Sequence, residues 1–250
     1  MRARFRMSSF VWRRRLCGLR KSTILISGGL NDGVLDNLQA LFLKGIAMNY
    51  SIIMVSELDR IAFRTDAEFY HPDHIRLSEK LAKIDSISIR KAGVFVDCSA
   101  FYPSIVPYYN FESKGVPFLR VNEIQDGLLR LSDSTVFLAK EILNENSSTI
   151  AICNPGDLVI AKGGNSLAKV ALLTDEYERY SVCRDLIVLR TQALNSLGAH
   201  YLWMFLNSKI GRMLLLRTAS QTGQPHLSLE AISRLDVPLI PARSQVLRPR

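Results

Sequence analysis

Apolar residues along this chain occur in short runs separated by turn residues, a pattern that predicts many strands and few helices. The clearest run is Leu158–Ala161, which follows the turn residues 154–157 and is rich in β-branched side chains. Gly163, Gly164 and Asn165 tolerate positive φ, as a tight hairpin turn requires. Residues 169–173 are therefore expected to form the return strand, and residues 186–189 the strand after it.

Two stretches have the apolar spacing of longer helices. Pro72 starts a predicted helix over 72–84, because its missing N–H has no partner at a first helical position. A second, uninterrupted helix is predicted over 200–217, with Gly211 as its weak point. Its expected apolar face consists of Leu202, Phe205, Leu206, Ile210, Met213 and Leu214.

The remaining patterns predict short elements of both kinds. Strands are expected at 22–27, 93–97, 116–122 and 236–240, and short helices at 34–44, 138–144 and 229–234. Ser228 is positioned to cap the last of these helices. The loop tyrosines, including Tyr102, Tyr108 and Tyr109, are expected to pack their rings against the rim of the core. Stacking of these rings on nucleic-acid bases is the alternative.

The composition favours a soluble globular protein with a nucleic-acid partner. The 250 residues are 48% hydrophobic and 22% charged, with a net charge of +9. The first 21 residues hold eight basic residues and no acidic one, so the rest of the chain carries only +1. A DNA-binding surface on the folded body must therefore be a local patch. The Arg-rich start also fits an organellar transit peptide or an appended leader.

The spacing of the cysteines and the hydropathy of the chain indicate whether it holds a zinc site and whether it crosses a membrane. The four cysteines, Cys17, Cys98, Cys153 and Cys183, lie far apart and form no C-x-x-C pair. This spacing indicates buried free thiols in a reducing cytoplasm rather than a zinc site. No apolar run is long enough for a transmembrane helix, so no membrane partner is expected. No metal site and no cofactor are predicted.

The usual catalytic motifs are missing from the sequence. There is no methyltransferase Asn/Asp-Pro-Pro-Tyr/Phe motif, no phosphate-binding glycine loop, no H-E-x-x-H and no G-x-S-x-G. One loose nuclease pattern occurs: Asp73 after Pro72, followed by Glu112-x-Lys114, in which two carboxylates would hold a metal ion. A metal-dependent nuclease using Asp73, Glu112 and Lys114 is therefore the alternative to a non-catalytic protein.

Side chains that can read DNA gather in three places. Lysine and arginine suit guanine or phosphate, and asparagine and glutamine suit adenine. The candidate DNA-binding residues are Lys162, Asn165, Ser166 and Lys169 at the hairpin tip, Gln221, Gln224 and His226 in a polar loop, and the pair Arg120 and Asn122. For each of them, a solvated or capping side chain is the alternative.

Five short motifs, in this order, resemble one target-recognition domain of a type I restriction–modification specificity subunit. They are Arg64-x-Asp66-Ala67-Glu68-x-Tyr70-x-Pro72, Val116-Pro117-Phe118-Leu119-Arg120-Val121, Pro155-Gly156-Asp157-Leu158-Val159-Ile160, Gly223-Gln224-Pro225-His226-Leu227-Ser228 and Val237-Pro238-Leu239-Ile240-Pro241. The resemblance covers residues 58–241. It leaves a basic N-terminal segment, 1–57, of unknown role and a basic tail, 242–250.

The resemblance implies an α+β fold (mixed α/β) with a twisted, largely antiparallel sheet and flanking helices. It implies a non-catalytic subunit that reads one half of a split target in double-stranded DNA. Its partners would be a methyltransferase subunit and, through it, a restriction subunit. Members of this family carry two recognition domains, whereas this chain has one. We therefore expect either a homodimer that supplies the second domain or an inactive, truncated remnant that binds only partner subunits.

Overall fold

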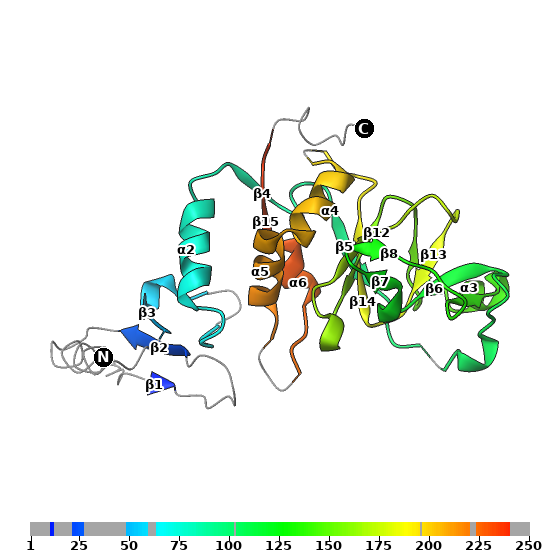
Figure 1. Cartoon of the computed structure of the whole chain (residues 1–250), viewed down its shortest axis with the longest axis horizontal. Coiled ribbons are helices and arrows are strands. Elements are labelled where there is room, and N and C mark those ends of the chain that lie inside the picture. The colour runs from blue at the N-terminus through cyan, green and yellow to red at the C-terminus, as the bar shows by residue number, and fades with distance from the viewer. Residues whose placement is uncertain are drawn as a thin grey trace, which may run out of the picture. The chain divides into compact units, whose positions relative to one another are not determined.

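The computed structural model describes residues 11–12, 22–27, 49–59, 64–102, 104–195, 197–220 and 224–240. The chain divides into two compact units, Met1–Lys80 and Leu81–Arg250 (Figure 1). The helix expected at 34–44 and the candidate residue Gln221 lie outside the described residues. The boundary at residue 57, which the resemblance motifs indicate, lies within the first unit. The roles assigned to residues 1–57, 58–241 and 242–250 stay predictions.

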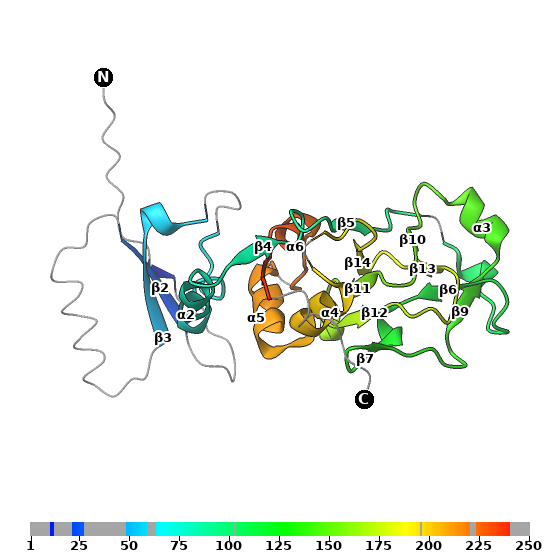
Figure 2. The ribbon, with the colours of Figure 1, turned by 90° about the horizontal axis from the view of Figure 1, so that it is seen from above.

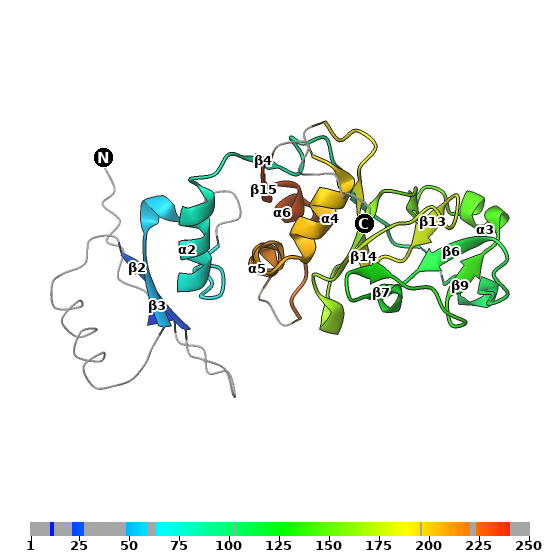
Figure 3. The same cartoon turned by 45° about the horizontal axis from the view of Figure 1, so that its top comes forward.

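In its described residues, the first unit contains a small sheet and one α-helix, together with a short 3-10 turn. Strand β1 (Val11–Trp12) pairs antiparallel with β2 (Ser22–Ser27), which pairs parallel with β3 (Asn49–Met54). Helix α2 (Pro72–Leu81) lies alongside β2 and β3 (Figure 3). Ile75 of α2 packs with the buried Ile53 of β3 and with Tyr70. The predicted helix is thus confirmed, ending at Leu81 rather than at residue 84.

The segment before α2 is held by contacts among the residues of the first resemblance motif. The guanidinium of Arg64 donates to the carboxylate of Asp66, with Nη2 2.6 Å from Oδ2, and lies over the ring of Phe69. The hydroxyl of Tyr70 accepts from the backbone N–H of Asp59 at 2.8 Å. These contacts order the chain just before Pro72 starts the helix, so this motif has a structural explanation.

Two sheets form the body of the second unit. The six-stranded sheet has the order β5 (Phe95–Cys98), β14 (Leu186–Arg190), β11 (Leu158–Ala161), β12 (Val170–Leu172), β8 (Leu128–Leu129), β7 (Ile124–Gln125). The four-stranded sheet has the order β10 (Ile152–Cys153), β13 (Tyr180–Val182), β6 (Val116–Leu119), β9 (Val136–Leu138). A further pair joins β4 (Ser86–Ser88) to β15 (Asp236–Pro238).

Most of these strand pairs are antiparallel; among the pairs described in the second unit, β12–β8 and β13–β6 are parallel. In the described part of this unit, four α-helices accompany the sheets: α3 (Lys140–Glu145), α4 (Ala199–Asn207), α5 (Lys209–Thr218) and α6 (Leu229–Ser233). Within this unit, α4, α5 and α6 gather on one side of the strands and α3 lies at the other end (Figure 2). The predicted α+β class with a largely antiparallel sheet is confirmed.

The central strand β11 is covered on both faces, which explains why its sequence is apolar throughout. Successive side chains of a strand point to opposite faces. Leu158 and Ile160 pack into a core shared with α4, α5 and α6, whereas Val159 and Ala161 pack into a core shared with the four-stranded sheet. All four residues are fully buried. The hairpin between β11 and β12 is therefore fixed to a rigid base.

The uninterrupted helix expected over 200–217 is wrong, because the chain breaks at Ser208. This residue is extended, ends α4 and caps α5, accepting from the N–H of Gly211 at 3.1 Å. Gly211 permits the sharp turn, since a Cβ there would stand 2.7 Å from the carbonyl carbon of Phe205. The break also rotates the apolar face, so that Leu215 is buried while Ile210 is exposed.

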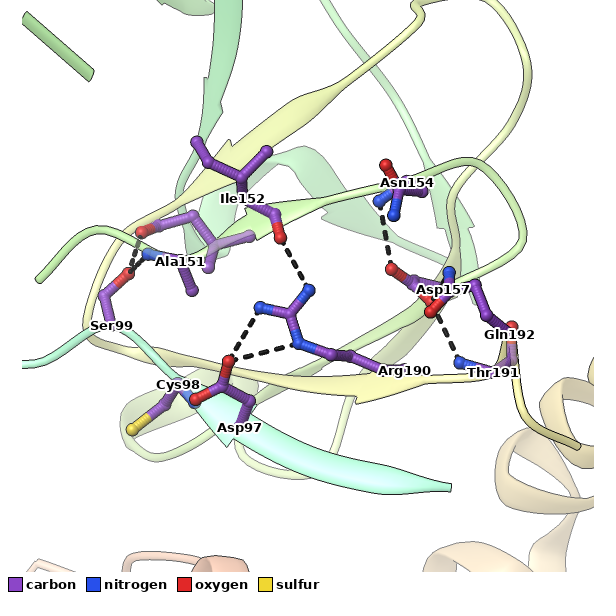
Figure 4. A network of polar contacts seen from close by, with 11 residues as sticks. Asp97, Cys98, Ser99, Ala151, Ile152, Asn154, Asp157, Arg190, Thr191 and Gln192 are labelled. Atoms are coloured by element: carbon purple, nitrogen blue, oxygen red, sulfur yellow. Dashed lines mark hydrogen bonds and ion pairs between the residues drawn. The ribbon is translucent and has the colours of Figure 1, made fainter. Parts of the chain in front are cut away.

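A polar network holds the start of the hairpin in place (Figure 4). The buried carboxylate of Asp157 accepts from the N–H groups of Asn154 (3.0 Å) and Thr191 (2.9 Å) and from the amide of Gln192 (2.6 Å). Beside it, the guanidinium of Arg190 on β14 donates to Asp97 of β5 and to the carbonyl of Ile152 on β10. Arg190 thereby joins the two sheets.

Among the residues that the structure describes, no helix has the length and apolar character that crossing a membrane requires.

Candidate nucleic-acid interface

The hairpin loop between β11 and β12, residues 162–169, is the centre of the candidate interface. The predicted hairpin is confirmed, with Val159 opposite Ala171 and Ile160 opposite Val170. The predicted tight turn is wrong in detail. Gly164 has the expected positive φ, 67°. Gly163, however, is extended, residues 164–166 form a turn of 3-10 helix, and Ala168 has a φ of 62°. The loop is therefore wider than a two-residue turn and presents more side chains.

The loop after α5 packs directly against this hairpin loop. Gly163 and His226 form an antiparallel bridge, and the N–H of Leu227 donates to the carbonyl of Lys162 at 2.9 Å. The carbonyl of His226 accepts from the N–H of Ser220 at 2.9 Å. Two of the three regions that the sequence singled out thus form one continuous surface, although they are far apart in the chain. We call residues 162–169 with 224–227 the hairpin surface.

Most candidate side chains on the hairpin surface are free to meet a ligand. Within the described residues, no hydrogen bond or ion pair engages the side chains of Lys162, Asn165, Ser166, Lys169, Gln224 or His226. Asn165, Gln224 and His226 are exposed, and both lysines are half-buried. Ammonium and amide groups held on a rigid hairpin suit phosphates and base edges. Their contact with DNA stays a prediction.

The third candidate pair differs from the others. The guanidinium of Arg120 donates to the buried carboxylate of Glu123 (3.1 Å) and to the carbonyl of Ser134 (2.7 Å). Glu123 also accepts from the N–H of Arg120, which closes a reciprocal cap on the 3-10 turn 121–123. These bonds hold Nη2 of Arg120 within its own unit, so Arg120 is less available for contact with a base. The neighbouring Asn122 is exposed.

Two arginines that sequence reasoning missed lie close to the hairpin surface. Arg212 of α5 donates to the carbonyl of Ala168 at 3.4 Å, and α5 contains three basic residues and no acidic one. Exposed Arg184 lies in the turn before β14, where the carbonyl of Asp185 accepts from the N–H of Lys162 at 2.9 Å. The carboxylate of Asp185 offsets part of this positive charge. The only signal in the sequence that could have indicated Arg212 is that the segment forming α5 holds basic residues without any acidic one.

The loop tyrosines divide into two groups. Tyr102 and Tyr109 pack their rings against Phe118, as predicted, with ring centres 6.3 and 6.0 Å from it. Burial raises the pKa of Tyr102 to about 12, and the nearby Cys183 thiol adds to the shift, whereas the backbone N–H of Arg184 opposes it. Tyr108 remains exposed, so the expectation that it packs on the core rim is wrong.

The residues of the nuclease alternative do not resemble a metal site. Asp73 lies in the first turn of α2 and pairs with Arg76, whose hydrogen bond lowers the pKa of the Asp73 carboxyl. Glu112 and Lys114 belong to the second unit, are exposed and pair with each other at 2.7 Å. Across the described part of the chain, no group of three or more His, Cys, Asp or Glu residues could hold a metal ion.

No protein-family model matches this chain, and no curated protein matches it in sequence. Several solved structures match this chain at low sequence identity, among them the following three. The type IIG restriction endonuclease BpuSI has 13% identity and a TM-score of 0.53, over 72% of this chain and 27% of BpuSI. A structure of type I R-M system assembly has 15% identity and a TM-score of 0.47, over 85% of this chain and 48% of the matched chain.

The third similar structure is the HsdS subunit from Thermoanaerobacter tengcongensis, with 15% identity and a TM-score of 0.42, over 86% of this chain and 47% of that one. The present chain thus spans less than half the length of each of these three proteins. The likeness to BpuSI shows a shared fold.

Proposed function

We propose that this chain is a sequence-specific DNA-binding module, the specificity component of a type I restriction–modification system. In this role it reads one half of a split site in double-stranded DNA and catalyses no reaction itself. The observation that carries the proposal is the hairpin surface, on which the side chains of Lys162, Lys169, Asn165 and Gln224 form no hydrogen bond or ion pair within the described residues.

Physical arguments support the use of this surface for DNA. Lysine ammonium groups attract phosphates, and amides held on loops of a rigid scaffold can discriminate bases in the major groove. The body of the chain is nearly neutral, so binding requires a local basic patch, and the hairpin surface with Arg212 and Arg184 supplies one. The five resemblance motifs and the fold shared with a restriction endonuclease support the same role.

The proposal extends to partners. A methyltransferase subunit would use the bound chain to find its site, and a restriction subunit would join through the methyltransferase. A homodimer, in which two copies of the chain supply two recognition modules, is part of the proposal. Light scattering of the purified chain, alone and with DNA, would report the number of copies.

The test of DNA recognition is a selection from random-sequence duplexes with the purified full chain. Enrichment of one short motif is expected, and methylation of that motif should appear in a host that also supplies the methyltransferase subunit. The absence of any enriched motif, with and without that partner, would overturn the proposal. Binding of partner subunits without any DNA footprint would instead identify an inactive remnant.

The role of the hairpin surface is tested by removing its charge. In Lys162→Gln with Lys169→Gln, the slope of log affinity against log salt should fall by about 1.8, because each lost phosphate contact contributes about 0.9. The matched control is Lys91→Gln with Lys140→Gln, which removes the same charge from other parts of the second unit. Equal slopes for both double variants would exclude the hairpin surface from phosphate contact.

A further inference from the structure

The second unit exposes a group of large apolar side chains that do not pack into its core. Phe101 is 79% exposed, Val106 61%, Tyr108 54% and Phe111 55%. They belong to one stretch of chain, and no residue from Cys98 to Phe111 carries a charge. We call these four residues the aromatic loop. Exposed apolar side chains that lie singly need no explanation, but a concentration of them indicates a contact surface.

The stretch that carries the aromatic loop is anchored between its exposed side chains. Ile105 is buried, and Tyr102 and Tyr109 pack against Phe118 of β6. Asn110 forms an isolated bridge with Phe137 of β9, donating and accepting one backbone hydrogen bond. The exposed rings therefore project from an ordered base. Such preorganisation lowers the entropic cost of using these rings in binding.

A chain of contacts links the aromatic loop to the hairpin surface. The hydroxyl of Ser99, two residues before Phe101, donates to the carbonyl of Val182. Three residues after Val182, the carbonyl of Asp185 accepts from the N–H of Lys162. The turn 183–185 thus connects the base of the aromatic loop with the first residue of the hairpin loop, and it carries the exposed Arg184 between them.

We propose that the aromatic loop contacts the same DNA as the hairpin surface and stacks both Phe101 and Tyr108 against the bases of an unstacked step. This inference rests on the proposed function. An apolar side chain can wedge into a base step, and an aromatic ring can stack on any base. The lysines of the hairpin surface and Arg184 supply the charge complementarity to phosphates that the uncharged aromatic loop lacks. The loop therefore contributes contacts that do not depend on salt.

The aromatic loop is tested with Phe101→Ala and Tyr108→Ala, separately and together, in the full chain. The probe is duplex DNA carrying the motif enriched by the wild-type chain. Each substitution should weaken binding by about tenfold, as expected for a lost base stack, while the salt slope stays unchanged. Phe95→Ala is the matched control, because Phe95 is 65% exposed but lies at the end of β5 that pairs with Arg190, away from the hairpin.

A second readout reports unstacking directly. Permanganate oxidises thymines that are no longer stacked, so the wild-type complex should show one hyperreactive thymine within the protected site. The double variant should lose that reactivity, and Phe95→Ala should keep it. Unchanged affinity in the double variant, with no hyperreactive thymine in the wild-type complex, would overturn the inference. Loss of methyltransferase binding with unchanged DNA affinity would also overturn it, because the loop would then be a protein-docking surface.

The two proposals fail in different ways. If the wild-type chain selects no DNA motif, the proposed function fails, and the inference about the aromatic loop fails with it. If the chain selects a motif and the lysine variants weaken binding while Phe101→Ala and Tyr108→Ala do not, only the inference about the aromatic loop fails. Circular dichroism of each variant would confirm that it is folded, since both side chains lie outside the core.

Discussion

A Cβ on Gly163 would stand 2.7 Å from Cε1 of His226, so the hairpin loop and the loop after α5 approach closely only because residue 163 is glycine. The backbone at Gly163 is extended, a conformation that any residue adopts. The constraint therefore comes from the imidazole and not from the conformation of the chain. This contact joins two loops that local sequence patterns treat as independent.

We expect Gly163→Ala to destabilise the protein by about 1 kcal/mol, because the added methyl must displace the imidazole of His226. Adding His226→Ala should restore most of that loss, since the opposing ring is then gone. Urea denaturation of the two single variants and the double variant forms a double-mutant cycle. Strictly additive effects would show that the two loops do not touch in solution.

Gly211→Ala is expected to destabilise the protein by at least about 2 kcal/mol, against the helix propensity of alanine. The new methyl would meet the carbonyl carbon of Phe205 at 2.7 Å, and this obstacle is backbone that cannot rotate away. Lys209→Ala, at an exposed position of the same helix, should change stability by less than about 0.5 kcal/mol. Thermal or urea unfolding measures both; a stabilised Gly211→Ala variant would mean that α4 and α5 form one continuous helix.

The variant Asp157→Ala should lose about 3 kcal/mol of the free energy of unfolding, because the N–H groups of Asn154 and Thr191 lose a buried acceptor. Asp157→Asn should cost less, about 2 kcal/mol, since its one oxygen can still accept while its amide opposes one of the donors. Asp175→Asn on the exposed loop 174–179 is the control, with a change within about 0.5 kcal/mol. Equal stabilities of the Asp157 and Asp175 variants would contradict the anchoring role of Asp157.

The buried thiols should make the protein less stable in alkaline solution. Burial raises the pKa of Cys153 to about 12 and that of Cys183 to about 11. Above pH 9 the unfolded chain loses these protons while the folded chain keeps them, so the unfolded state binds fewer protons and stability falls as pH rises towards 11. Urea denaturation between pH 8 and pH 11 measures the decline, which should be smaller in Cys153→Ala.

The same burial predicts slow thiol chemistry. In a Cys17→Ser background at pH 8, a thiol reagent should modify the partly exposed Cys98 first and reach Cys153 and Cys183 only on unfolding. Rapid modification of all three thiols in the native protein would argue against the buried positions of Cys153 and Cys183.

Local patterns predicted much of the fold because they report interactions within a few residues. The strand Leu158–Ala161, its return strand and the start of α2 at Pro72 follow from side-chain branching, turn residues and the missing N–H of proline. Ser228 caps α6 as predicted, accepting from the N–H of Ala231 at 3.1 Å. The break at Ser208 was not predictable from the apolar spacing, because the residues on both sides of it keep a helical pattern.

For the candidate interface, residue types identified side chains that can bind DNA, but not which of them are already engaged in contacts within the protein. Lys162 and Arg120 both suit a phosphate or a guanine, yet Arg120 is held by Glu123 and by the carbonyl of Ser134, whereas Lys162 has no side-chain partner within the described residues. Arg212 lies beside the hairpin only because α5 packs against it. The sequence does not show which charges are already engaged, since that depends on neighbours distant in the chain.

The sequence by itself determined the two strands of the central hairpin, the cap at Ser228 and the two polar loops, because each depends on the chemistry of neighbouring residues. Tertiary structure alone decided that Gly163 meets His226, that β11 is buried on both faces, and that Phe101 and Tyr108 stay exposed while Tyr102 and Tyr109 pack against the core. These outcomes depend on which distant segments come together, and close packing of the core admits few such arrangements.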